Sequence, residues 1–239
     1  VVLSFVIALC IALYSVPVVI RISHALKMFD QPNGRSSAHV AVPTLGGIAI
    51  FLGFILAATI GVDGYIFPGL TSIFTSLLLM FFVGLKDDIL NLSPYKKIIA
   101  QLIAAMILIF LAKIRFTNLH GFLGIEEIGY TLGVLLTIFV MIVFINAFNL
   151  IDGIDGLAAG LSIFASTLFG IWFYLTGHFE YAVLSLSLVG ALTGFFFYNV
   201  YGTKNKIFMG DTGSLILGTL MGVIVIKFNE FNIDQTAQY

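Results

Sequence analysis

Four short polar segments interrupt an otherwise apolar chain, and three of them carry aspartate beside glycine, asparagine or lysine. They are RSSAHVAVPTLGG (35–47), GLKDDILNLSPYKK (84–97), NAFNLIDGIDGLAAG (146–160) and FMGDTGSLILG (208–218). Carboxylate and amide oxygens without cysteine or a close histidine pair favour a hard cation, Mg²⁺ or Mn²⁺. Such a cation near lysines and an arginine suits a diphosphate. These residue types therefore predict metal-assisted phosphoryl transfer between a nucleotide-like donor and a lipid acceptor.

The second segment pairs two adjacent acids with two adjacent bases. Asp87 and Asp88 cannot point the same way on a helix, so one can face a metal while the other faces substrate or caps the chain. Lys96 and Lys97 follow a turn expected at Ser93-Pro94 and could return positive charge to the carboxylates. A solvated loop is the alternative.

The third segment predicts a polar helix face. Asp152 and Asp155 are three residues apart and would share a face with Asn146 and Asn149. The alternative is a glycine-rich packing seam whose acids cap the next helix. An aspartate in the middle of a membrane costs roughly 2.5–3.5 kcal/mol on an insertion scale, which favours a functional role.

The fourth segment places Asp211 before Thr-Gly-Ser at another expected helix start. An N-cap role is open, in which the carboxylate accepts from the backbone N–H of Gly213 or Ser214. A third acid-and-glycine helix end on one face favours a metal or phosphate site instead. In the first segment, Arg35 and His39 are predicted to bind substrate; His39 as a general base or as an interfacial histidine remains open.

The composition indicates an integral membrane protein. Of 239 residues, 60% are hydrophobic and 10% charged, and the mean hydropathy is +1.11. Soluble domains carry roughly 25% charged residues. The net charge of −1 gives no support for nucleic-acid binding, and the single cysteine, Cys10, excludes an internal disulfide. Residues 1–20 lack a basic start and a small-residue cleavage pattern, so they are predicted to form a first membrane helix.

The apolar stretches predict an all-α bundle of about eight membrane helices in a single domain, residues 1–239. A membrane helix needs about 20 apolar residues, and the stretches lack the alternation of a β-barrel. Two short stretches reach spanning length if flanking lysines snorkel. The predicted helices are 1–20, 36–62, 64–85, 98–112, 128–151, 156–179, 181–203 and 212–226.

The distribution of cations predicts the orientation. Loops at one end of the predicted helices hold eight of the eleven cations, and the other end holds Lys113, Arg115 and Lys227. By the positive-inside rule the cation-rich face is cytoplasmic and the N-terminus is periplasmic. The acids at the cytoplasmic face are Asp30, Asp87, Asp88, Asp152, Asp155 and Asp211. Five of these six adjoin Gly-rich or Asn-rich helix ends, which suggests a shared cation.

The four segments, in this order, resemble the motifs of the polyprenyl-phosphate N-acetylhexosamine-1-phosphate transferases of glycosyltransferase family 4, which include the phospho-MurNAc-pentapeptide translocases. The resemblance covers about residues 35–222. It implies a Mg²⁺-dependent enzyme of the bacterial inner membrane, with its active site facing the cytoplasm. Such an enzyme moves a sugar-1-phosphate from a UDP-HexNAc to undecaprenyl phosphate and releases UMP. The first segment is more similar to members that transfer GlcNAc-1-phosphate and start lipopolysaccharide, teichoic acid or related glycans. A homodimer is left open.

The resemblance also implies roles by position. Asp87 looks like the carboxylate that deprotonates or positions the lipid phosphate, with Asp88 as its partner. Asp152 and Asp155 are implied as further catalytic residues, and with Asn149 they would serve the metal and the nucleotide sugar. Asp211 looks like the Mg²⁺ ligand, joined by Asp88 and Asn149. The implied substrate-binding residues are Arg35, His39, Lys96, Lys97 and Asn149.

One departure and two rival classes accompany the resemblance. Family members carry a histidine-rich loop near the C-terminus, and none of the four histidines stands there, so the chain is expected to lack that loop and the helices around it. A cation-coupled transporter would place its acids near the bilayer midplane and show paired repeats. A CDP-alcohol phosphotransferase would show a different motif order around Asp152.

Overall fold

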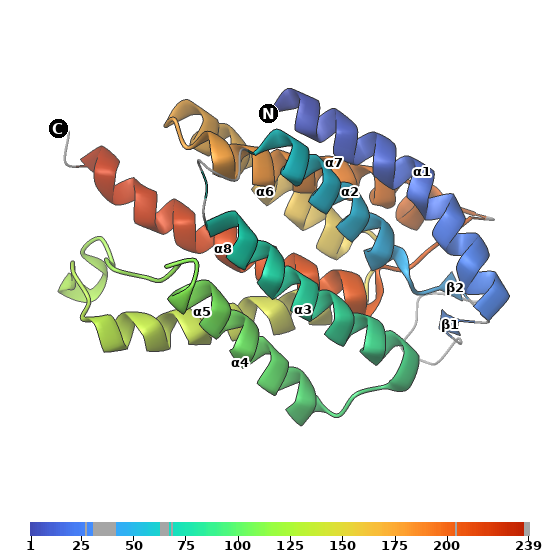
Figure 1. Cartoon of the computed structure of the whole chain (residues 1–239), viewed down its shortest axis with the longest axis horizontal. Helices are drawn as coiled ribbons and strands as arrows, with labels where there is room; N and C mark the ends of the chain where they lie inside the picture. The colour runs from blue at the N-terminus through green and yellow to red at the C-terminus, as the bar shows by residue number, and fades with distance from the viewer. Residues whose placement is uncertain (27, 31–41, 63–66, 68, 204, 237–239) are drawn as a thin grey trace.

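The computed structural model describes residues 1–26, 28–30, 42–62, 67, 69–203 and 205–236. Within them the chain forms eight α-helices, which confirms the predicted all-α class (Figure 1). The helices are α1 (Val2–Leu26), α2 (Gly46–Gly61), α3 (Gly69–Leu90), α4 (Pro94–Phe110), α5 (Tyr130–Ile151), α6 (Leu157–Leu175), α7 (Phe179–Tyr201) and α8 (Gly210–Thr236). A short antiparallel pair, β1 (Phe29–Asp30) with β2 (Val42–Pro43), and a 3₁₀ turn, η1 (Phe122–Gly124), complete the described elements.

Six of the eight helices are long and apolar enough to cross a membrane: α1, α3, α5, α6, α7 and α8. The other two, α2 and α4, have 16 and 17 residues. At about 1.5 Å per residue these span about 25 Å, less than a hydrocarbon core of about 30 Å. The chain is a multi-pass helical membrane protein.

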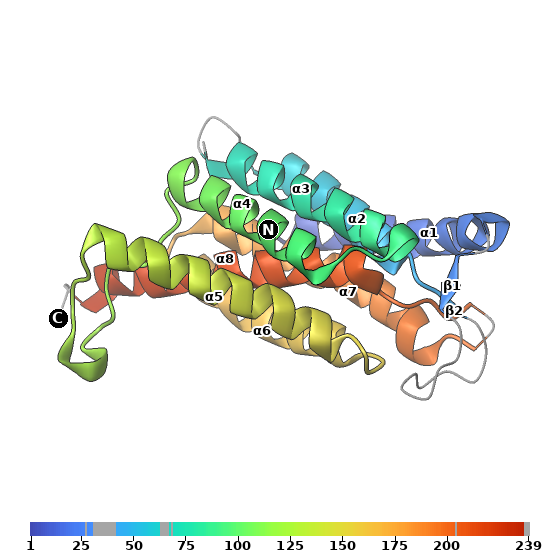
Figure 2. The same cartoon turned by 90° about the horizontal axis from the view of Figure 1, so that it is seen from below.

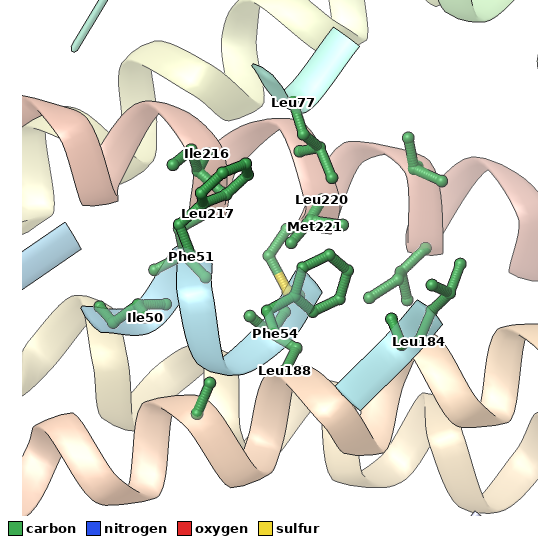
Figure 3. Close-up of a cluster of buried hydrophobic side chains, with 14 of the residues drawn as sticks. Ile50, Phe51, Phe54, Leu77, Leu184, Leu188, Ile216, Leu217, Leu220 and Met221 are labelled. Carbon is green, nitrogen blue, oxygen red and sulfur yellow. The ribbon is translucent and has the colours of Figure 1, made fainter. Parts of the chain in front are cut away.

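The helix α8 is the centre of the bundle and packs against α2, α3, α5 and α6. Figure 2 shows α8 running beneath α3 and beside α5 along the long axis of the molecule. In the apolar core, Phe54 of α2 lies between Leu220 of α8 and Leu188 of α7, while Leu77 of α3 faces α8 from the other side (Figure 3). The helices α7 and α8 are the most buried of the six: 67% of the residues in the apolar segment of each are buried, compared with 22% for α5.

A small residue allows α3 to approach α8 closely. A Cβ atom at Gly84 would lie 2.5 Å from the Cα of Thr212, which no real side chain tolerates. Close backbone approach through glycine is a common way to pack membrane helices. Here it brings the last turn of α3 against the first turn of α8, and the aspartates of both turns come with them.

Several helix boundaries differ from the predicted ones. The second predicted helix, 36–62, is helical only from Gly46, and residues 31–41 lie outside the described part of the chain. The helix α3 continues to Leu90 and α4 begins at Pro94, so the expected loop 84–97 shrinks to three residues. The solvated-loop interpretation of Asp87 and Asp88 is therefore wrong, because both lie in the last turns of α3.

The predicted helix face shared by Asp152 and Asp155 is also wrong. The helix α5 ends at Ile151, and residues 152–156 form a turn before α6. Gly156 has φ of 73°, in the left-handed region where glycine is strongly favoured. The two acids are therefore held by a turn, which lets them point to different partners.

Candidate active site

Four chain segments meet at one end of the bundle. They are the end of α3, the start of α4, the turn between α5 and α6, and the start of α8. Five of the acids predicted at this face, Asp87, Asp88, Asp152, Asp155 and Asp211, lie in these segments, whereas Asp30 lies in β1. The described structure thus brings together carboxylates from distant parts of the sequence, such as Asp87 and Asp211, as the charge distribution predicted.

Asp88 caps the N-terminus of α8. Its Oδ1 accepts the backbone N–H of Asp211 at 2.7 Å, and its Oδ2 accepts the N–H of Thr212 at 3.0 Å and the Thr212 hydroxyl at 2.5 Å. A carboxylate is well placed there because the first N–H groups of a helix lack partners within the helix and carry partial positive charge. The cap of α8 therefore comes from α3, and not from Asp211 itself as the local alternative proposed.

Asp87 is buried, with 2% of its side chain exposed, and forms an ion pair with Lys97. Its Oδ1 accepts the backbone N–H of Leu92 at 2.6 Å, which fixes the short connection between α3 and α4. The Nζ of Lys97 also lies 3.4 Å from Oδ2 of Asp211. Lys97 is thus the lysine that joins α3 to α8, whereas Lys96 is exposed in the same helical turn.

Asp211 lies in the first turn of α8 and is held from two sides. Lys97 approaches its Oδ2, and the amide nitrogen of Asn149 donates to its Oδ1. The same amide nitrogen lies 2.9 Å from the hydroxyl oxygen of Ser214. Asn149 therefore orients Asp211 with its nitrogen, and its own oxygen is not the atom directed at that carboxylate.

Asp152 lies next to three other acids. Burial is the main cause that raises its pKa well above the ordinary value, and the negative charges of Asp211, Asp88 and Asp155 raise it further. A hydrogen bond with the backbone of Gly210 opposes this effect. Repulsion of this kind between carboxylates is relieved by a cation, so it points to a binding site for positive charge.

Asp155 faces the connection between α7 and α8. Its Oδ2 accepts a hydrogen bond of 2.5 Å from the ammonium group of Lys206, which lies 5.7 Å from the centre of the Phe208 ring. Asn199 of α7 binds both the turn between α5 and α6 and the connection between α7 and α8. Its Oδ1 accepts the N–H of Gly156 at 2.7 Å, and its Nδ2 donates to the carbonyl of Ile207 at 2.9 Å.

The remaining predicted site residues stand apart. Arg35 and His39 lie outside the described residues, so their predicted role in substrate binding stays a prediction. Asn146, expected on the same polar face as Asn149, instead exchanges hydrogen bonds with the buried Gln101 of α4. This amide pair joins α4 to α5.

Sequence reasoning missed the positioning residues of the site. Thr212, Ser214, Lys206 and Asn199 each bind or orient a site segment, but only Thr212 and Ser214 lie in a quoted motif. Lys206 is separated by only one residue from the fourth motif, and its charge beside Phe208 is the one local signal. Asn199 gives no such signal because its partners are 8 and 43 residues away.

The donor set fits Mg²⁺ at Asp211 and Asp152 better than at Asp88. Among the described residues, no three acidic, histidine or cysteine side chains form a ready metal cluster. Both oxygens of Asp88 accept hydrogen bonds that cap the backbone of α8, whereas those of Asp211 face only the side chains of Asn149 and Lys97, which can move aside. The neighbouring negative charges that raise the pKa of Asp152 also favour a cation at that carboxylate. Mg²⁺ commonly binds through one or two carboxylates together with water and substrate phosphates.

The fold and site define a class: a multi-pass helical membrane protein with a carboxylate-rich site where helix ends meet. Comparison with known proteins specifies the class further. The model of glycosyl transferase family 4 matches residues 70–229, from the start of α3 to near the end of α8. The chain therefore belongs to glycosyl transferase family 4.

Three relatives illustrate the range within this family. The chain is 34% identical to a probable undecaprenyl-phosphate N-acetylglucosaminyl 1-phosphate transferase of Bacillus subtilis, over 94% of this chain and 62% of that protein. It is 30% identical to a phospho-N-acetylmuramoyl-pentapeptide-transferase of Desulforamulus reducens, over 95% of this chain and 73% of the relative. It is 29% identical to an undecaprenyl-phosphate alpha-N-acetylglucosaminyl 1-phosphate transferase of Salmonella typhi, over 83% of this chain and 54% of that protein. The chain thus spans about half to three quarters of the length of these relatives.

Proposed function

We propose that the chain carries the catalytic centre of a phosphoglycosyl transferase. It would transfer a HexNAc-1-phosphate, specifically GlcNAc-1-phosphate, from a UDP-sugar to undecaprenyl phosphate. The observation that carries this proposal is the meeting of Asp87, Asp88, Asp152 and Asp211 with one lysine, Lys97, at the ends of membrane helices. The names of two of the relatives specify the same donor group and lipid.

The proposed reaction exchanges one phosphorus–oxygen bond for another. An oxygen of the lipid phosphate attacks the sugar-bearing phosphorus of the UDP-sugar, and the bond from that phosphorus to the bridging oxygen breaks. The products are a lipid diphosphate sugar and UMP, which leaves with the bridging oxygen. Negative charge grows on that oxygen, so positive charge beside the diphosphate lowers the barrier.

Each residue of the site has a part in this proposal. Asp211 and Asp152 would hold Mg²⁺, which when bound neutralises the donor diphosphate. Lys97 would contact the attacking or transferred phosphate, because its side chain is 24% exposed and its ammonium group lies between two carboxylates. Asp87 would hold that ammonium group in place, since its own side chain is buried. Asp88 would fix the start of α8, and with it the position of Asp211.

The second candidate function is transfer of phospho-MurNAc-pentapeptide. The specific observation in its favour is the Desulforamulus reducens relative, whose identity is close to that of the GlcNAc-1-phosphate enzymes. Both functions require the same bond change and the same carboxylates. The two functions differ in the sugar that is transferred, and the acidic cluster does not identify the residues that would select that sugar.

Two donor labels test the proposal. Membranes bearing the full protein are incubated with undecaprenyl phosphate, Mg²⁺ and UDP-GlcNAc that is labelled in its sugar-linked phosphate or in its uridine. We expect the phosphate label in the lipid fraction and the uridine label in UMP. Uridine label in UDP would contradict the proposal, because then only the sugar has moved.

Two controls complete the experiment. The Asp211→Asn variant should give neither product, and a chelator should stop the reaction until Mg²⁺ is restored. A parallel reaction with UDP-MurNAc-pentapeptide separates the two candidate functions. We place the reaction at the inner face of the bacterial inner membrane, where the predicted cation-rich loops lie.

A further inference from the structure

A pocket lies at the end of the bundle opposite to the acidic site. Its volume is about 340 Å³, and it is lined by Ile109, Phe110, Lys113, Arg115, Thr117 and Tyr130. The helix α5 begins at this pocket with Tyr130 and ends beside Asp152 after 22 residues, or about 33 Å. The pocket therefore lies at the other membrane boundary, where the connection between α4 and α5 turns at the left of Figure 2.

The pocket concentrates positive charge. Two of the three cations assigned to this end of the protein, Lys113 and Arg115, line it. The ion pairs among the described residues involve only Lys97 and Lys206, so neither pocket cation is ion-paired with a described acid. Glu230, a carboxylate that contacts the lining, is bound by Thr117. The guanidinium group of Arg115 stacks 4.7 Å from the centre of the Tyr130 ring, which holds it at the pocket wall.

The backbone presents Lys113 in an unusual way. Its φ of 55° lies in the left-handed region, which a lysine rarely adopts. A tight reversal after α4 thereby brings Lys113 and Arg115 to the same pocket. Thr117, also in the lining, is held by Glu230 of α8 through hydrogen bonds of 2.8 Å from its backbone N–H and 2.9 Å from its hydroxyl.

An apolar surface leads to the pocket along α4. Ile99, Ile103, Met106 and Phe110 follow one another at helical spacing, and each side chain is between 41% and 53% exposed. Residues at intervals of three and four lie on one face of a helix. Phe110, the last of them, is also part of the pocket lining, so the cationic pocket and the apolar face are continuous.

We propose that this pocket binds a phosphate group, with the hydrocarbon chain of a lipid that carries it lying along the exposed face of α4. Arg115 would bind two phosphate oxygens with its planar fork, and Lys113 would add a second charge. A phosphate diester headgroup such as that of phosphatidylglycerol has the required charge and sits at the required depth. The site is distinct from the acidic site and does not depend on the proposed function.

Native mass spectrometry of the purified full protein tests this directly. The protein is released from mixed micelles that hold phosphatidylglycerol and phosphatidylcholine in equal amounts, and the retained lipids are counted by mass. We expect a preference for phosphatidylglycerol. The double variant Lys113→Asn/Arg115→Gln should reduce that preference on the order of thirtyfold, as expected for two lost cations at a membrane surface.

Two further variants separate this site from a general charge effect and from misfolding. The control Arg21→Gln/Lys86→Asn also removes one arginine and one lysine, both exposed and outside the pocket, and should keep the preference. The charge-keeping variant Lys113→Arg should keep it as well, because it leaves the planar fork of Arg115 in place. Asparagine is chosen at position 113 because it tolerates a positive φ.

A second arm replaces the lipid by inorganic phosphate and measures binding to the native protein and to both neutral variants. Binding of lipid alone identifies a lipid headgroup as the source of the phosphate. Binding of inorganic phosphate that is lost only in the Lys113→Asn/Arg115→Gln variant keeps the phosphate site and identifies a soluble source. Equal retention of both lipids by the native protein, or equal losses in both neutral variants, overturns the proposal.

Discussion

The carboxylates at the two ends of α8 have opposite surroundings. At its start, Asp87, Asp88, Asp152 and Asp211 lie together with Lys97 as the lysine between them. Toward its end, Glu230 accepts the N–H of Thr117, and its two carboxylate oxygens share the proton of the Thr117 hydroxyl group. The first arrangement leaves negative charge in excess, whereas in the second a single carboxylate accepts neutral donors and lies near one cation, Lys227.

The difference separates a functional site from a structural contact. A satisfied carboxylate fixes the loop that it binds and needs nothing further. Crowded carboxylates raise one another's pKa and destabilise the fold unless a cation or a substrate accompanies them. Because the chain carries this penalty at one end of α8 and not at the other, we propose that the binding site lies at the first end.

The largest expected effect is on activity at the acidic end. The change Asp211→Asn removes the negative charge that would bind the cation, but it preserves the shape of the side chain and an acceptor for Asn149. Transfer should fall at least about a hundredfold, as for other groups that stabilise transition-state charge. The rate of UMP release checks this. Thermal unfolding close to that of the native protein shows that the loss is chemical.

Next in size is the loss of Lys97. The change Lys97→Met leaves Asp87 buried without its counter-charge, and breaking such a pair from one side costs roughly 3 kcal/mol. Thermal unfolding in detergent measures the loss. The double variant Asp87→Asn/Lys97→Met should recover most of it, because asparagine still accepts the N–H of Leu92. A double variant as unstable as the single one contradicts this account of the pair.

A smaller change in stability is expected at Asp152, where a substitution should stabilise the protein at neutral pH and not destabilise it. Its raised pKa means that the folded state holds a proton more firmly than the unfolded state, so the penalty is absent below the ordinary pKa of about 3.9 and grows as pH rises toward the folded pKa. At neutral pH the Asp152→Asn variant should therefore unfold at a higher temperature than the native protein. Its transfer activity should nevertheless fall.

The higher unfolding temperature of the Asp152→Asn variant should disappear at pH about 4, where the native carboxyl is largely protonated. Mg²⁺ should also reduce this difference in unfolding temperature by stabilising the native protein more than the variant. The matched change Asp155→Asn should give no such gain, since Asp155 is paired with Lys206. A variant that is less stable than the native protein at neutral pH shows that Asp152 is not under repulsion.

The smallest effect is expected at the other end of α8. The change Glu230→Gln keeps the shape of the side chain and one acceptor for Thr117, so the unfolding free energy should fall by about 1 kcal/mol. The transfer rate should stay within about twofold of the native rate. Loss of activity at normal stability would instead extend the functional site across the membrane.

Much of the fold follows from apolar stretches, whereas helix ends do not. Hydrophobic runs of membrane length predicted each of the eight helices. The last turns of α3 and the first turn of α4 carry Asp87, Asp88, Lys96 and Lys97, which an apolar window excludes. The predicted helices therefore ended too early at residue 85 and began too late at residue 98. The turn after Ile151 depends on Gly156 at a positive φ, and glycine alone does not specify that conformation.

The site is partly predictable for a similar reason. The unequal distribution of charge between the loops predicted that the acids lie on one face, and the motifs identified which acids these are. Their individual partners depend on how α3, α4, α5 and α8 pack. The choice of Lys97 over Lys96, and of Asp88 as the cap of α8, therefore required contacts more than 100 residues apart in sequence.

The central claim is that the crowded acids at the start of α8 perform the reaction, while the satisfied acid near its end does not. One side-by-side measurement tests it: UMP release by membranes bearing the native protein, Asp211→Asn or Glu230→Gln, at equal protein amounts and saturating Mg²⁺. The account predicts a loss of at least about a hundredfold for Asp211→Asn and a rate within about twofold of native for Glu230→Gln. Native-like release from Asp211→Asn, or equal losses in the two variants, would contradict it.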